Sequence, residues 1–505
     1  MSVQEPSGHE VATVGDRDEP VIVDLDPVAV AGPAPRPPGS DHRGSFARRA
    51  GVVDDAHLSA VAAIVADAAE RKLHSVRVSF VDQHGLLRTK TVAVTRLAEV
   101  FADGVGVTGS LLAQDTGNQF ALPLWRPSGV GALDDMIGAR DMVMLPDPTT
   151  WRLVPWAEGT GWLLCDLYSA GARPLPLSTR GLCRDAVAAL ADAGYRLRVG
   201  LELELHLFDA HTMAPIHPGW ELLGDNHLDR VQARLEPLRL MLEALGVPLR
   251  SLEIEQGPGQ IELTFAPTSA FQLADEAVLV RAAISQVARR NEMIASFMCR
   301  PPGPDSFPSG WHLHQSLTDG NHTNMLSGMA GEGPLSTVGR HWVGGLLAHA
   351  TASCLLSTPT VNGYKRYRPN SVAPDRVAWG EQHRGAMLRI IGGGDDPSTR
   401  IENRVGEPAA NPYLYVAAQL VSGLDGLRRK IEPPPVSASP YRADAGPLLP
   451  RSLGEAIERF GASELYRSVW GDDVVEYLTR LKTSEWNRFL AAVTDWEQRE
   501  YFELF

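Results

Sequence analysis

The sequence predicts an α+β protein in which a small strand-rich domain precedes a larger α+β domain. Three observations support this fold class. Residues 75–94 alternate between apolar and polar side chains as strands do, stretches with helical apolar spacing dominate after residue 178, and no internal repeat is found. We expect a disordered tail over residues 1–48, a first domain over 54–165 and a second domain over 175–505.

The first domain should begin with a helix, because residues 54–72 carry apolar side chains at helical spacing. Residues 75–94 then predict two strands joined by a turn at residues 83–85. A short helix should follow and end at Gly104. Further short strands are expected at residues 141–156 and 159–168.

The second domain should mix helices with strands that carry polar residues. It opens with a helix over residues 179–195, which leads directly into an alternating strand at residues 199–208. Helical spacing recurs in three longer segments and again in the last part of the chain, at residues 228–245, 268–299, 336–357 and 453–505. Strands between these helices indicate a larger α+β domain.

The composition excludes several classes of function. A net charge of −14 argues against nucleic acid or an anionic membrane as the main partner. No apolar run is long enough to span a bilayer, and the first residues resemble no signal peptide. The four cysteines form no paired motif, which suits a reducing compartment. We therefore expect a soluble cytoplasmic protein.

The strand VGLELELHLF at residues 199–208 places Glu202, Glu204 and His206 on one face. An acidic alternating strand is usually a solvated sheet face, so this stretch alone indicates little. Three further stretches repeat the pattern, however. They carry Glu255 and Glu262; His312, His314 and Ser316; and Glu402 and Arg404.

Divalent cations would explain why so many carboxylates occupy strands that are otherwise built for a core. Leaving several carboxylates partly buried without partners costs several kcal/mol each. Hard ions such as Mg²⁺ or Mn²⁺ prefer carboxylate oxygens and tolerate one imidazole, so the set predicts a two-metal site. Arginines interleave with these ligands and would suit phosphoryl transfer, at positions Arg366, Arg384, Arg389, Arg400 and Arg404.

Taken in order, these stretches resemble the glutamine synthetase superfamily. The matching segments are VGLELELHLF, EQGPGQIELTF, SGWHLHQSL, NGYKRYRPN, RIENRVGEPAANPYL and WEQREYFELF, and the resemblance covers roughly residues 75–505. It implies an N-terminal β-grasp domain and a C-terminal catalytic domain with a curved antiparallel sheet flanked by helices. It also implies a homo-oligomer of stacked rings, with a dodecamer expected and active sites between neighbouring subunits.

The resemblance further implies a role for each matched residue. Glu204, Glu255 and Glu262 would hold one metal ion, and Glu202, His312 and Glu402 a second. Arg366 and Arg404 would bind the α-carboxylate of the acid substrate, and Arg384 would stabilise the transferring phosphoryl group. ATP would be contacted by Ser316, His314, Arg389 and Arg400, and two to three Mg²⁺ or Mn²⁺ ions would be bound.

Two departures from the family concern the amine. Ammonia-using relatives carry acids where this chain has Thr108 and Val372, and neither residue replaces an anionic acceptor for ammonium. This disfavours a true glutamine synthetase and favours an ATP-dependent ligase that joins glutamate to an apolar alkylamine or arylamine through γ-glutamyl phosphate. A γ-glutamylpolyamine synthetase, a true glutamine synthetase, a phosphotransferase and a non-catalytic relative remain alternatives.

A third departure concerns the acid substrate. Family members carry Asn-Gly before the SGxH motif, in the loop over the bound glutamate, whereas Phe307 and Pro308 stand here. Proline removes a backbone donor, so the acyl donor would be held differently or would not be glutamate. Since Arg366 and Arg404 are retained, glutamate stays the favoured substrate.

Overall fold

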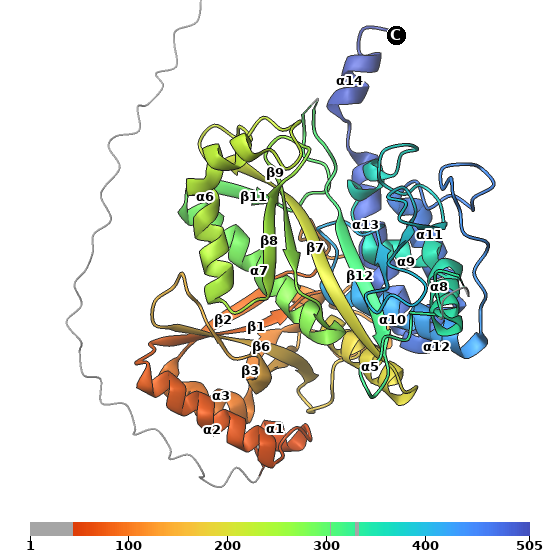
Figure 1. The fold of residues 1–505 in the computed structure, drawn as a ribbon. Coiled ribbons are helices and arrows are strands. Elements are labelled where there is room, and N and C mark those ends of the chain that lie inside the picture. Colours follow the sequence, from red (N-terminus) through yellow and green to blue (C-terminus); the bar gives the residue numbers. More distant parts are fainter. Residues whose placement is uncertain (1–43, 304, 329–332) are drawn as a thin grey trace, which may run out of the picture. The chain divides into compact units, whose positions relative to one another are not determined.

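A computed structural model describes residues 44–303, 305–328 and 333–505 (Figure 1). Residues 1–43 of the expected tail therefore lie outside the described residues. The end of that tail differs from the expectation, because helix α1 (Phe46–Arg49) is present there. Phe46 is buried and meets the ring of Tyr168 edge-on, with ring centroids 6.0 Å apart, and burial of this aromatic side chain anchors the segment.

The first part of the chain is a mixed sheet with helices along one face (Figure 1). Its strand order is β2-β1-β6-β4-β3, with β5 also paired to β6. The strands are β1 (Ser75–Val81), β2 (Leu87–Ala93), β3 (Val105–Thr108), β4 (Asp141–Pro146), β5 (Arg152–Leu153) and β6 (Thr160–Ser169). The predicted hairpin is confirmed, because β1 and β2 pair antiparallel around a turn in which Gly85 has a φ of +78°.

Helix α2 (Asp55–Glu70) and helix α3 (Leu97–Asp103) agree with the predicted helices of this part. Asp54 begins α2, because its carboxylate accepts the N–H of His57 at 2.7 Å. The predicted end of the first domain at residue 165 falls inside β6, which continues to Ser169. The first part therefore extends a few residues further than the alternation in the sequence indicated.

The second part is built on a larger, mostly antiparallel sheet of order β13-β14-β15-β12-β7-β9-β8. The central strand is β7 (Arg196–Asp209), which also pairs with the two short strands β10 (Thr268–Ser269) and β11 (Met293–Ser296). The remaining strands are β8 (Leu249–Ile254), β9 (Gln260–Phe265), β12 (Trp311–Thr318), β13 (Trp379–Glu381), β14 (Leu388–Ile391) and β15 (Arg400–Asn403). These two sheets and their helices are the α+β architecture that the sequence predicted.

Helices cover the apolar face of the large sheet. On β7 this face consists of Leu201, Leu203 and Leu205, all buried, while the acids point the other way. Helices α5 (Thr179–Asp192) and α7 (Ala270–Arg290) pack against β7. Helix α10 (Pro412–Arg429) packs against both of these helices. The other helices are α4 (Gly131–Asp134), α6 (Asp225–Ala244), α8 (Thr337–Ala348), α9 (Ala350–Ser357), α11 (Leu453–Gly461), α12 (Glu464–Trp470), α13 (Asp472–Ala491) and α14 (Asp495–Tyr501).

Two expected helices are shorter than the apolar spacing indicated. The helix expected over 268–299 ends at Arg290, because Glu292 adopts a φ of +56° and the chain then enters β11. The helix expected over 336–357 is divided at His349 into α8 and α9. Apolar periodicity alone does not mark such breaks.

The two parts meet at a buried ionic junction. The guanidinium of Arg180 on α5 donates to Asp147 and Asp166 of the first part and to Asp275 on α7, each at 2.8 Å. Asn411 adds a hydrogen bond from its side chain to the carbonyl of Asp82 at 3.0 Å. These bonds place the small sheet against the helical face of the large domain.

The four cysteines are free and buried. Among the helices of the described residues, none combines the length and the apolar composition needed to cross a membrane.

Candidate active site

Strand register brings the polar residues of the large sheet together on one face. Glu204 of β7 lies directly opposite Glu262 of β9, which in turn lies opposite Glu253 of β8. On the other side of β7, Glu202 faces His312 of β12. Directly opposed residues share a face. The same rule places Glu402 of β15 beside His314 and Arg389.

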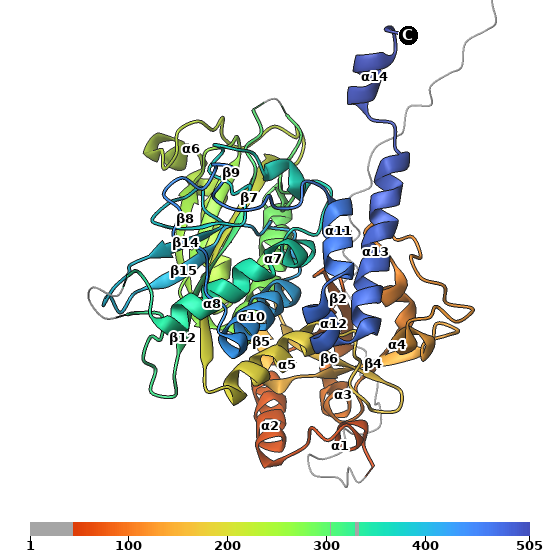
Figure 2. The ribbon, with the colours of Figure 1, turned by 90° about the vertical axis from the view of Figure 1, so that its right-hand side faces the viewer.

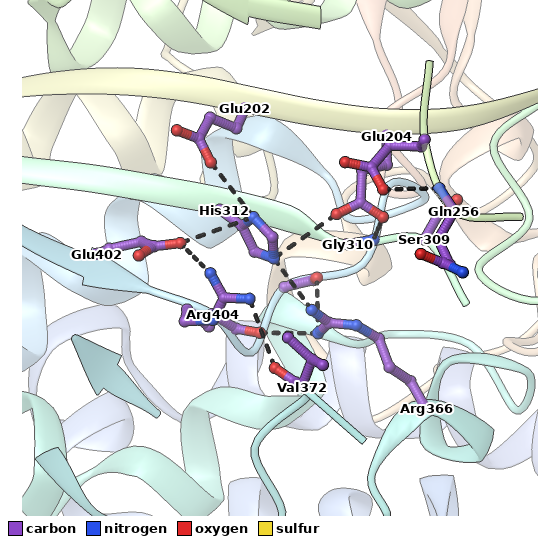
Figure 3. A network of polar contacts seen from close by, with 12 residues as sticks. Glu202, Glu204, Gln256, Ser309, Gly310, His312, Arg366, Val372, Glu402 and Arg404 are labelled. Carbon is purple, nitrogen blue, oxygen red and sulfur yellow. Dashed lines mark hydrogen bonds and ion pairs between the residues drawn. The ribbon is translucent and has the colours of Figure 1, made fainter. Parts of the chain in front are cut away.

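Two groups of these side chains are close enough to hold a cation (Figure 3). One consists of Glu202, His312 and Glu402, and the other of Glu204, Glu262 and His312, with ligand atoms within 4.8 Å of one another. The group of Glu202, His312 and Glu402 is the set that was predicted to hold the second metal ion. The other contains two of the three predicted ligands of the first metal. Glu255 lines the same cavity, and its carboxylate accepts the N–H of Gln256 at 2.9 Å.

Glu402 is fully buried and is held by cationic side chains. It pairs with Arg404 and, at 3.0 Å, with Arg389, while Nδ1 of His312 lies 3.7 Å from it. Arg366, also buried, directs Nη2 toward Nε2 of His312 at 3.2 Å and donates Nη1 to the carbonyl of Arg404 at 2.7 Å. Because a guanidinium only donates, the Nε2 atom of His312 accepts and its proton lies on Nδ1, facing the carboxylates.

The cluster shifts the pKa values of its acids in opposite directions. Burial, reinforced by Glu204, raises the pKa of Glu262 to about 10, and burial beside Glu255 raises that of Glu204 to about 7. Burial acts in the same direction on Glu202, but hydrogen bonds from His312 and His314 outweigh it and lower the pKa. The surroundings of Glu202 and Glu402 therefore favour their ionised forms, whereas burial favours the protonated form of Glu262.

A buried amide supports the acid side of the cluster. Gln260 donates from Nε2 to Glu204 at 2.9 Å and to Ser309 Oγ at 3.0 Å, and the N–H of Gly310 also donates to Glu204 at 2.9 Å. Sequence reasoning missed Gln260. Its position two residues before Glu262, on the same face of β9, was the signal that could have found it.

His206, the third polar residue of the β7 face, does not join the cation cluster. Its two ring nitrogens face the carbonyls of Pro258 and Phe307, each at 3.1 Å. The side chain of His206 therefore links the turn after β8 to the loop before β12. Its role on this strand face is to position these two loops.

A cavity of about 560 Å³ gathers most of the predicted site residues. Its walls include the six predicted metal ligands, four of the five predicted arginines and three of the four residues at which the chain departs from the family, namely Glu202, Glu204, Glu255, Glu262, His312, Glu402, Arg366, Arg384, Arg389, Arg404, Val372, Phe307 and Pro308. Arg384 is exposed and forms no ion pair within the described part of the chain. The walls also contain Glu253, Leu222 and Leu223, which sequence reasoning did not single out.

A second cavity of about 410 Å³ adjoins the first through Glu202 and Glu253 and contains His314 and Arg400. His314 accepts from Arg400 at 3.3 Å and reaches Glu202 at 2.8 Å, so it connects the two cavities. Ser316 lies further along the same face of β12 but lines neither cavity.

Thr108 lies away from both cavities of this chain. It ends β3 in the small sheet, where its hydroxyl contacts Ser110 Oγ at 2.9 Å. Val372 does reach the cavity and has a φ of +64°, which is a strained conformation for a β-branched residue. Its carbonyl accepts from Arg404 at 3.4 Å, so the strained loop is tied to the arginine cluster.

Buried carboxylates and one imidazole on one sheet, with several arginines beside them, are the groups needed by an enzyme that binds cations and transfers phosphoryl groups. Comparison with known proteins agrees. Residues 176–501 match the family model described as glutamine synthetase, catalytic domain. A γ-glutamylanilide synthase of Acinetobacter sp is 40% identical over 486 residues, which cover 89% of this chain and 97% of that protein.

Further relatives extend the comparison. A γ-glutamylethanolamide synthetase of Streptomyces coelicolor is 33% identical and covers 85% of this chain and 93% of its own. The solved structure of ligand-free GmaS superposes with a TM-score of 0.75 at 26% identity, and covers 87% of this chain and 99% of its own. The chain belongs to the glutamine synthetase family. It is an ATP-dependent carbon–nitrogen ligase, and enzymes of this family use ATP and divalent metal ions.

Proposed function

We propose that the protein joins glutamate to an apolar organic amine, an alkylamine or an arylamine, through γ-glutamyl phosphate. The observation that carries the proposal is the cavity itself, which combines cation ligands and arginines with an apolar residue, Val372, where ammonia-using relatives carry an acid. Relatives named as γ-glutamylanilide synthase and glutamate–isopropylamine ligase support the same amine class.

The residues of the cavity fit divalent cations. Clustered carboxylates with one imidazole suit Mg²⁺ or Mn²⁺, and the raised pKa values of Glu204 and Glu262 are what uncompensated buried acids produce. Two to three ions would be held by Glu202, His312 and Glu402 and by Glu204, Glu255 and Glu262. The ions would supply charge neutralisation for ATP and for the acyl phosphate.

Residues of the chain itself would bind glutamate, the transferring phosphoryl group and the nucleotide. Arg366 and Arg404 would bind the α-carboxylate of glutamate. The exposed guanidinium of Arg384 would meet the phosphoryl group as it moves from ATP to the side-chain carboxylate, which releases ADP. His314, Ser316, Arg389 and Arg400 would contact the nucleotide, which is supported for His314 and Arg400 by the adjoining cavity.

Amide formation then requires an uncharged amine. The amine nitrogen bonds to the acyl carbon, the bond from that carbon to the phosphate oxygen breaks, and the proton from nitrogen leaves with phosphate or solvent. An arylamine is neutral at pH 7 and needs no acid in the pocket, whereas an alkylamine resembling lysine, with a pKa near ~10, must first lose a proton. This difference fits the loss of acids at Val372 and Thr108.

We also propose a homo-oligomer of stacked rings, a dodecamer, in which Thr108 of one copy approaches the cavity of the next. Two observations support association. Thr108 is remote from the cavity of its own chain. Figures 1 and 2 show α14 projecting beyond α13, and the exposed residues of this end include Trp496 on α14 and Phe502 directly after it.

Mass spectrometry of the products tests this function. The protein is incubated with ATP, Mg²⁺ or Mn²⁺, glutamate and separate amines: ammonium, putrescine, isopropylamine and aniline. A γ-glutamyl amide of isopropylamine or aniline, with little glutamine, is the expected result. Preferred formation of glutamine or of γ-glutamylputrescine would identify one of the alternatives, and ATP turnover without any amide would identify a phosphotransferase or a different acyl donor.

A further inference from the structure

Two leucines on the rim of the acidic cavity stand out from its charged walls. Leu222 and Leu223 lie in the connector between β7 and α6, and both line the cavity although they are 53% and 61% exposed. The carboxylates are deeper, since Glu204 is 8% exposed and Glu402 is 0% exposed. The cavity therefore has an ionic floor and an apolar entrance.

The backbone fixes these leucines beside the acids. Leu223 donates its N–H to the carbonyl of Ile254 at 3.0 Å, and Trp220 donates to the carbonyl of Gln256 at 2.8 Å. Gly219 allows the close approach, because a Cβ there would lie 2.6 Å from the backbone nitrogen of Pro258. The connector is thereby held along the segment that carries Glu255, and the leucines occupy a defined place rather than a free loop.

The charge of the walls limits what this entrance can receive. Val372 and Pro308 add apolar surface to it. Among the described residues that line the cavity, Glu253 is the one acid outside the proposed metal ligands. A second cationic group on the amine would find few free carboxylates to pair with at this entrance. A hydrocarbon group would instead contact the partly exposed apolar side chains there and remove them from water.

We propose that Leu222 and Leu223 form the wall that receives the ring of a primary arylamine, and that they set the amine preference of the enzyme. The inference deepens the proposed ligase function and rests on it. The amine nitrogen would lie toward the buried acids and arginines, and the ring would lie toward the leucines and Val372. The leucines act on the choice of amine and not on activation of glutamate.

The test compares kcat/KM for aniline, methylamine and putrescine in the wild type, the double variant Leu222→Ala/Leu223→Ala and Leu223→Glu. The alanine variant should lose roughly 10-fold in kcat/KM for aniline while its value for methylamine changes little, because three carbons leave each contact. Leu223→Glu should lower the value for aniline and raise that for putrescine. Leu240→Ala, an exposed leucine of α6 outside the cavity walls, is the matched control and should leave all values unchanged.

Three results would overturn the inference. Parallel changes for all amines, or an unchanged ratio between aniline and methylamine, would show that the leucines do not contact the ring, although organic amides are still formed. A changed native mass with an unchanged ratio would assign them to a contact between copies. Failure of the wild type to form any organic amide would overturn the proposed function itself, and with it this inference.

Discussion

At the scale of single residues, the site depends on side chains that hold the acids as well as on the acids. Gln260 is buried and donates to Glu204, so it fixes that carboxylate in the cluster. Replacing it removes a contact of the kind that typically changes metal affinity by roughly 10–100-fold. Alternation in the sequence identifies Glu204 and places Gln260 on the acid face of β9, but the contact between the two side chains is determined by the register of β7 and β9.

Gln260→Leu should therefore weaken Mn²⁺ binding by roughly 10–100-fold. Isothermal titration with Mn²⁺ measures the effect, and circular dichroism checks that the variant folds. Ser309→Ala is the matched control, because it removes the other acceptor of Gln260 and leaves the bond to Glu204 intact. Equal affinities in Gln260→Leu and the wild type would contradict the supporting role.

The raised pKa values predict how stability and metal binding depend on pH. The pKa of Glu204 is about 7 and that of Glu262 about 10, above their ordinary value of 4.5, so their contribution to stability is fully present below pH 4.5 and is lost as pH rises through 7 and 10. The melting temperature of protein kept in a chelator should therefore fall between pH 6 and pH 9. Glu407, buried with a pKa of about 7, adds to that fall without contacting the cluster.

Cations should reverse the part of this fall that belongs to the cluster. Because each bound ion displaces protons, affinity should rise by up to about tenfold per pH unit for each proton released. Titrations in buffers of different ionisation enthalpy count those protons. Glu262→Gln should melt with a weaker dependence on pH, and a cation affinity that is equal at pH 6 and pH 9 would contradict the assignment.

At the scale of elements, helix α5 joins the two parts of the molecule through Arg180. This side chain is 2% exposed and bonds to three partly buried carboxylates, so its loss removes the cation that all three share. Arg180→Met should cost about 3–5 kcal/mol of unfolding free energy. Arg184→Met is the control, because Arg184 lies on the same helix and pairs with Asp166 but is 41% exposed. Equal losses in the two variants, measured by chemical denaturation, would contradict the burial argument.

Elements also show how far the sequence predicts the structure. The hairpin of β1 and β2 and the acid faces of β7, β9, β12 and β15 follow from alternation, which is a local property. The end of α7 at Arg290 does not, because the apolar pattern continues into β11 while pairing with β7 decides the conformation. Leu222 and Leu223 could not be identified either, since only the bonds of their connector to the segment after β8 bring them to the cavity.

At the scale of the whole molecule, the proposed assembly assigns the exposed aromatic residues of α14 and its neighbours to a contact with another copy. Trp496 is 56% exposed and Phe502 is 75% exposed. The variant Trp496→Ser/Phe502→Ser should therefore form smaller assemblies than the wild type, as measured by sedimentation equilibrium. Met213→Ser, which changes an apolar residue of similar exposure at 57%, is the control. An unchanged mass in the α14 variant would remove this helix from the interface.

The most direct test of the central claim follows oxygen from glutamate to phosphate. The protein is supplied with ATP, Mg²⁺, an organic amine and glutamate that carries ¹⁸O in its side-chain carboxylate, and the released phosphate is analysed by mass spectrometry. If the cavity activates glutamate as an acyl phosphate, each amide formed should be accompanied by one phosphate containing ¹⁸O. Amide formation with unlabelled phosphate would contradict the account.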